Sequence, residues 1–127
     1  MSGKVDRIIA GKEIINEGQH VESLYVLLAG EVQVFLPESD SRPARIDVTT
    51  RKMHECFGEY SFIDKQPAST SITALTDCAV YVISHVAFQE FLDKHKKAGF
   101  IVYRNLLTVL VERLREDNTE LDLFNMG

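Results

Sequence analysis

The residues best suited to chemistry lie in one stretch of the chain, between Phe57 and Thr70. Gly58 precedes Glu59 there; a glycine lets the backbone approach a ligand closely, and a carboxylate accepts hydrogen bonds. The stretch ends in hydroxyl residues, Ser69 and Thr70, which are able to hold an anion. These residue types could exchange hydrogen bonds with a small ligand, but a Gly-Glu pair by itself does not identify a site. They also suit the first turn of a short helix and an ordinary β-strand.

The histidines and cysteines do not form the patterns of an enzyme or a metal site. The histidines are scattered without the close spacing of metal ligands, and no serine, histidine and aspartate grouping carries a nucleophile signature. The cysteines are too few and too far apart in sequence for a disulfide framework, and free cysteines favour core positions. We therefore expect no enzymatic activity, no metal and no cofactor. The residues concerned are His20, His54, His85, His95, Cys56 and Cys78.

Composition indicates a small globular protein and argues against nucleic acid and membranes as partners. The chain has 127 residues, 45% hydrophobic and 26% charged, which is the range of one globular domain with one core. Its formal net charge of -5 argues against a nucleic-acid partner, because neutralising phosphates needs clustered Lys and Arg. No apolar run approaches the roughly 20 residues of a membrane span, and no signal peptide is evident. We expect one cytoplasmic domain over residues 1–127, with neither nucleic acid nor membrane as partner.

Short β-type runs fill the chain up to about Ser84. The continuous apolar run 24–29 is typical of a strand covered on both faces, and Gly30 supplies the tight turn that follows it. Other β-type runs are 12–16, 45–50, 70–75 and 78–83, and the polar segment 37–43 is an expected exposed loop. In the run after Gly30, the predicted inward residues are Val32, Val34 and Leu36, and the predicted outward residues are Glu31, Gln33 and Phe35. These runs predict a sandwich or closed barrel over about residues 7–84.

Helical periodicity replaces the β pattern over about residues 85–121. Ser84 is the expected N-cap of a first helix, which should lie against the barrel. A second, longer helix is predicted from about Phe100 to Leu121. The apolar residues of the first helix are Val86, Phe88, Phe91 and Leu92, and those of the second are Tyr103, Leu106, Leu107, Leu110 and Leu114.

Two blocks of the sequence resemble the cyclic nucleotide-binding domain family. Residues 11–18 (GKEIINEG), followed by 23–34 (SLYVLLAGEVQV), are similar to the opening strands of that family. Residues 57–67 (FGEYSFIDKQP) resemble the first part of its phosphate-binding cassette. The resemblance covers nearly the whole chain and implies a mainly β fold with C-terminal helices. It implies a double-stranded β-helix, or jelly-roll barrel, with a short helix inside the cassette and a lid-like or dimer-forming helix at the end.

The resemblance also implies roles for residues of the cassette. Glu59 stands where the family's glutamate takes the ribose hydroxyl of a cyclic nucleotide, and Ala68 stands where the family has an arginine for the phosphate. Compensation by hydroxyls and helix amides is weaker than a cation, and Lys65 is expected to face solvent. We therefore predict a stand-alone regulatory or sensor module that binds cAMP or cGMP weakly or not at all. The implied ligand-binding residues are Phe57, Gly58, Glu59, Tyr60, Ser61, Pro67, Ala68, Ser69, Thr70 and Asn118.

The end of the chain leaves several interpretations open. The family's last helix pairs with its twin or covers the ligand, so we expect a homodimer and allow Asn118 to meet a purine edge or to lie on an exposed turn. The apolar residues Leu121, Leu123 and Phe124 suit a built-in ligand, disorder or partner contact equally. No helix-turn-helix segment follows, so direct gene regulation is not expected. Alternatives to nucleotide sensing are ligand-independent dimerisation, binding of an effector protein, and sensing of another small ligand.

Overall fold

The computed structural model describes residues 3–105, 107–108, 111–112 and 115, apart from the side chain of Tyr60. The chain divides into two compact units, Met1–Phe88 and Gln89–Gly127. The boundary between the units, after Phe88, lies inside the helix His85–Lys94. The expectation of one domain over the whole chain stays a prediction.

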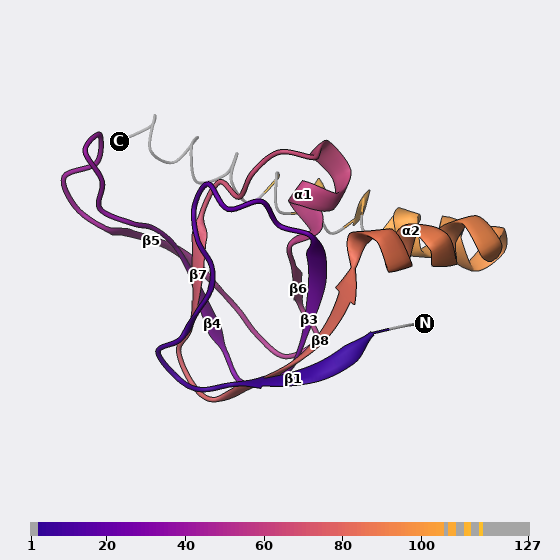
Figure 1. The fold of residues 1–127 in the computed structure, drawn as a ribbon, viewed down its shortest axis with the longest axis horizontal. Helices are drawn as coiled ribbons and strands as arrows, with labels where there is room; N and C mark the ends of the chain where they lie inside the picture. Colours follow the sequence, from indigo (N-terminus) through magenta and orange to yellow (C-terminus); the bar gives the residue numbers. More distant parts are fainter. Residues whose placement is uncertain (1–2, 106, 109–110, 113–114, 116–127) are drawn as a thin grey trace. The chain divides into compact units, whose positions relative to one another are not determined.

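The first unit contains two antiparallel sheets, each of four strands (Figure 1). One sheet has the order β1-β8-β3-β6 and the other has the order β2-β7-β4-β5. The strands are β1 Lys4–Ile8, β2 Glu13–Ile15, β3 Ser23–Ala29, β4 Val32–Leu36, β5 Ile46–Arg51, β6 Cys56–Phe57, β7 Ser71–Ala74 and β8 Cys78–Ser84. The mainly β jelly-roll prediction is confirmed, with two paired sheets in place of one closed barrel.

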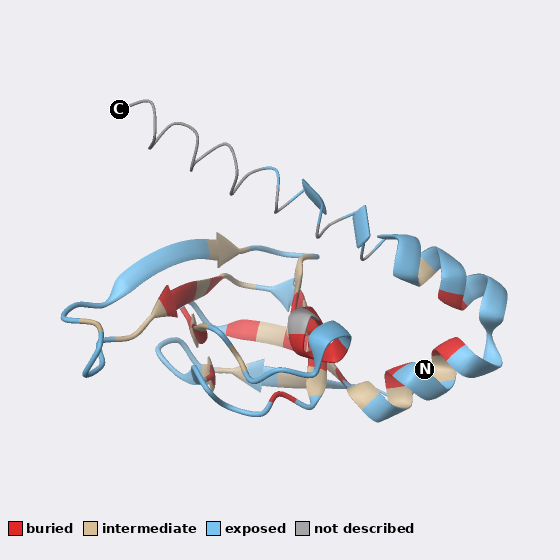
Figure 2. Ribbon diagram, turned by 90° about the horizontal axis from the view of Figure 1, so that it is seen from above, coloured by how far each residue is buried: buried red, intermediate tan, exposed pale blue. Residues whose placement is uncertain are grey.

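The core lies between the two sheets and is made of alternate strand residues. Leu27, Val32 and Val80 are fully buried, and Ile15, Val34, Ile72 and Ala74 surround them. Figure 2 shows the buried positions confined to part of the strands. At the start of β8, buried Cys78 and Val80 alternate with half-buried residues, as a two-residue side-chain period predicts, whereas β5 has no buried residue.

Two details of the expected burial were wrong. The β3 strand is not covered on both faces, because Leu28 is 38% exposed. Phe35 was expected to face solvent and is only 4% exposed, yet it is not part of the core cluster between the sheets. The guanidinium of Arg45 lies 3.8 Å from the centre of the Phe35 ring and covers it. Cover of this kind by a side chain from another segment cannot be predicted from an alternating pattern.

Two strands were not predicted. The β1 strand begins at Lys4, before the expected start of the barrel near residue 7, and β6 has only two residues. The sequence of β1 (KVDRI) is mostly charged and exposed, so it lacks the apolar run of a core strand. Its position is set by pairing with β8 along its whole length, from Lys4 opposite Val82 to Ile8 opposite Cys78.

The helical part begins where expected. The α2 helix spans His85–Lys94, and the Ser84 hydroxyl accepts the Ala87 N–H at 3.0 Å, which confirms the predicted cap. Residues 96–105 of the second unit are also helical. Tyr103 and Leu107 are exposed, whereas Leu106, Leu110 and Leu114 lie outside the described residues. Within the described part, no helix is long and apolar enough to cross a membrane.

Candidate functional site

The Phe57–Thr70 stretch joins β6 to β7 and contains one short helix, α1, at Glu59–Asp64 (Figure 1). Left-handed residues stand at both of its ends, Gly58 with φ 85° and Lys65 with φ 59°. The Lys65 N–H donates to the Ser61 carbonyl at 3.0 Å and closes the last turn. A left-handed residue cannot continue an α-helix, so these two positions fix its length. The short helix expected inside the cassette is therefore present.

Gly58 is required by its surroundings as well as by its φ angle. A Cβ atom at this position would lie 2.6 Å from the Ser23 carbonyl oxygen and 3.4 Å from the Tyr25 ring. The first distance is well inside van der Waals contact, so any side chain would push β6 away from β3. The missing side chain thus serves close packing of two strands, in addition to any approach of a ligand.

Glu59 is the most buried charged residue that the structure describes. It is 1% exposed, and its Oε2 oxygen is inaccessible to solvent. Burying a carboxylate is costly unless it is hydrogen-bonded or paired. Glu59 also has an interaction within the protein, so its burial fits a structural role as well as the predicted binding role.

The neighbours of Glu59 are also buried. Phe57 is 3% exposed, and its ring stacks on that of Tyr25 with centroids 4.9 Å apart and an interplanar angle of 3°. Burial, followed by the charge of Asp6, raises the pKa of Tyr25. Ser61 is 8% exposed. We call residues 57–61 the glutamate end of the site. All of its described side chains, those of Phe57, Glu59 and Ser61, are buried.

An aromatic cluster connects α1 to the first turn of α2. The Phe62 ring meets the His85 ring at 5.3 Å and the Phe88 ring at 5.0 Å, both in edge-to-face arrangements. Burial lowers the pKa of His85; the Lys65 charge adds to this, while the Gly58 and Ser23 carbonyls and Glu22 oppose it. His85 Nε2 is buried without a hydrogen-bond partner among the described residues. A neutral imidazole is therefore favoured at this position.

The other end of the site, residues 67–71, is built from small hydroxyl side chains, and we call it the hydroxyl end. Pro67 and Ser69 are exposed, Ala68 and Thr70 are half-buried, and Ser71 is 3% exposed. The turn after β2 is bonded to it: Gly18 N–H donates to the Ala68 carbonyl at 2.8 Å, and Ala68 N–H donates to the Gln19 carbonyl at 2.9 Å. The segment 67–71 itself carries no Lys or Arg.

Two cavities lie in the first unit near these residues. One, of about 330 Å³, is bordered by α1, the β2–β3 connection and the start of α2, and its lining includes His20, Ser61, Lys65 and His85. The other, of about 290 Å³, is lined by residues of β1 and β2 and by Tyr25. Ser61 is thus the predicted ligand residue that lines the first cavity.

The other residues singled out in the sequence are the tail residues, Tyr60 and the two cysteines. Asn118 and the apolar tail residues Leu121, Leu123 and Phe124 lie outside the described residues, as does the Tyr60 side chain. Cys78 is buried and Cys56 is half-buried, and both are free thiols. Among the residues described, no three His, Cys, Asp or Glu side chains lie close enough to hold a metal ion.

Sequence reasoning missed several residues that the fold brings to the site. Tyr25 stacks on Phe57 from β3, and Glu17 donates its backbone N–H to the Ser71 hydroxyl at 2.9 Å. Arg42, in the β4–β5 hairpin, forms an ion pair with Glu17, with Nη2 and Oε2 3.1 Å apart. No local pattern marks these positions, because each reaches the site through strand pairing or turn contacts between distant segments.

Comparison with known proteins identifies the family of this arrangement. A sequence model described as "Cyclic nucleotide-binding domain" matches residues 6–95. The chain is 26% identical over 111 residues to the CRP-like cAMP-activated global transcriptional regulator of Mycobacterium tuberculosis, covering 87% of this chain and 47% of that protein. The chain therefore spans about half the length of this relative.

Solved structures show the same fold. The catabolite activator protein of Thermus thermophilus superposes with a TM-score of 0.81 at 25% identity, covering 97% of this chain and 55% of that one. A cyclic nucleotide-binding domain from Methylobacillus flagellatus superposes with a TM-score of 0.82 at 26% identity, covering 90% of this chain and 63% of that one.

Proposed function

Because this chain belongs to the cyclic nucleotide-binding domain family, we propose that it is a regulatory module that binds cAMP or cGMP weakly. The observation that carries the proposal is the contrast within residues 57–71. The glutamate end has a buried carboxylate, Glu59, and a glycine, Gly58, that leaves no room for a side chain. The hydroxyl end has Ala68 where the resemblance implies an arginine.

Physical magnitudes support weak binding. A hydrogen bond to a charged group contributes about 1.5 to 3 kcal/mol, which is roughly tenfold to hundredfold in affinity. Hydroxyls and backbone amides of Ser69 and Thr70 are exposed enough to meet an anion, but they carry no net charge. The ribose hydroxyl would be taken by Glu59, so recognition of the sugar is retained while the attraction for the phosphate is reduced.

The experiment is titration calorimetry of the full chain with cAMP and with cGMP, comparing the wild type with Ala68→Arg. We expect the variant to bind about tenfold to a hundredfold more tightly. Ala68→Met is the control, because it adds an unbranched side chain without charge, and it should not gain affinity. Sub-micromolar binding by the wild type, or no gain in Ala68→Arg, would contradict the proposal.

A second candidate function, self-association, is favoured by the second unit. The helical segment after residue 95 exposes large apolar side chains at helical spacing: Phe100 is 66% exposed, Leu107 56% and Val111 44%. Exposed apolar stripes of this kind mark interaction surfaces. We propose a homodimer through this segment, which would act with or without a nucleotide. Analytical ultracentrifugation tests it, and a chain that stays monomeric at high micromolar concentration would exclude it.

A further inference from the structure

Arg42 is held in a defined position in the β4–β5 hairpin. Its Nη2 atom lies 3.1 Å from Glu17 Oε2, and its Nη1 atom donates to the Pro37 carbonyl at 2.6 Å. Its side chain is 22% exposed, so it is the least exposed basic group in the ion pairs of the described residues. A guanidinium has more N–H donors than these two contacts use, so donors remain for an anion.

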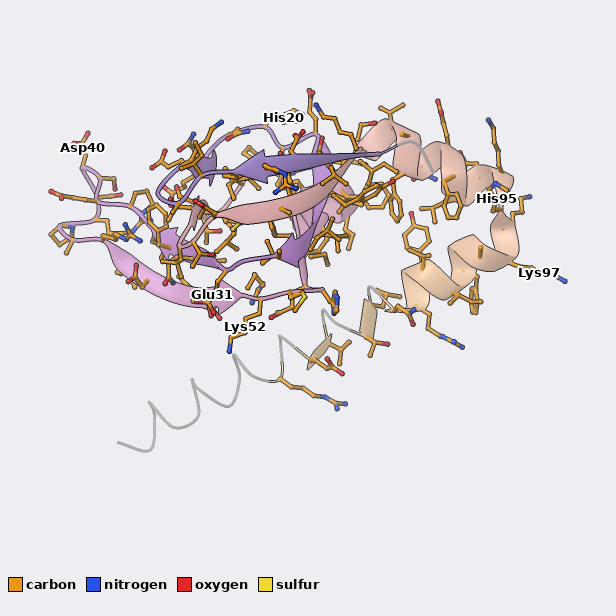
Figure 3. The ribbon with its side chains drawn as sticks, turned by 90° about the horizontal axis from the view of Figure 1, so that it is seen from below. His20, Glu31, Asp40, Lys52, His95 and Lys97 are labelled. Carbon is orange, nitrogen blue, oxygen red and sulfur yellow. The ribbon has the colours of Figure 1, made fainter. Side chains whose placement is uncertain are left out.

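The turn that carries Glu17 is bonded to the hydroxyl end at three points. Glu17 N–H donates to the Ser71 hydroxyl, Gly18 N–H donates to the Ala68 carbonyl, and Gln19 accepts the Ala68 N–H. Figure 3 labels His20 in this β2–β3 connection and Asp40 near the tip of the hairpin that carries Arg42. The guanidinium is therefore one ion pair away from a turn that is directly bonded to Ala68 and Ser71.

Building on the proposed function, we infer that Arg42 supplies the cation for the anionic end of the ligand, in place of the residue at position 68. Residues 67–71 have hydroxyls but no positive charge of their own. A guanidinium presents a planar fork of donors that suits a phosphate. Glu17 orients this fork and also competes with the ligand for it. Sharing of the charge explains why the resulting affinity is low and not absent.

The other basic residues nearby are less suited to this role. Arg45, in the same hairpin, is 48% exposed and is engaged by Asp47 at 2.9 Å and by the Phe35 ring. Lys65 is exposed at the end of α1, with its Nζ atom 4.8 Å from the centre of the Phe62 ring. In the part of the chain that the structure describes, neither Arg45 nor Lys65 forms an ion pair or hydrogen bond with residues 17–19, whereas Arg42 pairs with Glu17.

The test measures binding of cAMP and cGMP to the full chain by titration calorimetry in four variants. Arg42→Ala should weaken binding at least about tenfold, and Arg42→Lys, which keeps the charge but loses the fork, should weaken it less. Arg45→Ala is the matched control from the same hairpin and should leave the affinity unchanged. Ala68→Arg combined with Arg42→Ala should bind as well as Ala68→Arg alone, because one cation then replaces the other.

The outcomes separate this inference from the proposed function. If Arg42→Ala and Arg42→Lys bind as the wild type does, while Ala68→Arg still gains affinity, the role of Arg42 is overturned and the proposed function stands. If Ala68→Arg does not bind either nucleotide, the proposed function fails and this inference fails with it. Circular dichroism of each variant, with Arg42→Lys expected to stay folded, ensures that a loss of binding is not a loss of fold.

Discussion

The two ends of the segment 57–71 are stabilised in different ways. At the glutamate end, Gly58 has a left-handed conformation, Glu59 is buried and Phe57 stacks on Tyr25. At the hydroxyl end, Pro67 and Ser69 are exposed, Ala68 contacts the turn at residues 17–19 through its backbone, and the buried Ser71 hydroxyl accepts the Glu17 N–H. A side-chain change at positions 67–69 should therefore cost the fold less than one at the glutamate end.

This difference explains how the family fold accommodates Ala68. The Ala68 N–H and carbonyl make its contacts with the turn, and the backbone is the same for any side chain at that position. Under the proposed function, an alanine at this position would lower ligand affinity without removing these backbone contacts. At Gly58 and Glu59 the proposed binding role and the packing of the fold would rest on the same residues, so the two cannot be changed separately.

Among substitutions that test the difference between the two ends, Gly58→Ala should cause the largest loss of stability. A Cβ atom would approach the Ser23 carbonyl to 2.6 Å at a left-handed backbone angle, so we expect a loss of about 2 to 4 kcal/mol in the free energy of unfolding. Gly11→Ala is the matched control, because Gly11 has φ 88° with no atom within 4 Å of the added Cβ, and it should cost about 1 kcal/mol. Urea unfolding measures both, and equal losses would show that contact with Ser23 is unimportant.

The next effect concerns the charge at the glutamate end. In an Ala68→Arg background, Glu59→Gln should weaken cyclic nucleotide binding about tenfold to a hundredfold, because the acceptor for the ribose hydroxyl loses its charge. Asp64→Asn, at the exposed end of α1, is the control and should bind as its parent does. Unchanged affinity in Glu59→Gln would show that Glu59 has only a structural role at the start of the helix.

The smallest effect is a dependence of stability on pH through His85. Burial lowers its pKa, so the unfolded chain binds a proton more readily than the folded one as the pH falls below the ordinary value of 6.5. Its contribution to stability is therefore present above pH 6.5 and is lost as the pH falls through the folded pKa. Urea unfolding at pH 7.5 and at lower pH should show a smaller acid loss in His85→Gln than in the wild type.

His20→Gln provides the control for this measurement, because His20 lines the same cavity but is exposed. Its pH dependence should match that of the wild type. If His85→Gln and the wild type lose the same stability on acidification, the contact between α1 and α2 is not sensitive to protonation of this imidazole.

Much of the fold was predictable because its signals are local. The run 24–29, the turn at Gly30, the alternation after it and the cap at Ser84 all correspond to observed elements. The exceptions are β1, β6 and the burial of Phe35. They depend on pairing with β8, on pairing with β3 and on cover by Arg45, respectively. Contacts between distant segments produce no periodic apolar pattern in a short or charged segment, so local patterns could not predict these features.

The sequence by itself determined which residue types occupy the site: a glycine and a glutamate at one end, hydroxyls at the other, and an alanine at position 68. Local patterns also determined the strands and the short helix that carry them, because side-chain periodicity and turn residues act over a few positions. Only the tertiary structure decided that Glu59 is buried, that Tyr25 stacks on Phe57, and that Arg42 lies beside the turn bonded to Ala68. Those outcomes bring together segments up to 54 residues apart, as from Glu17 to Ser71, and proximity of that kind arises only when the two sheets pair and pack.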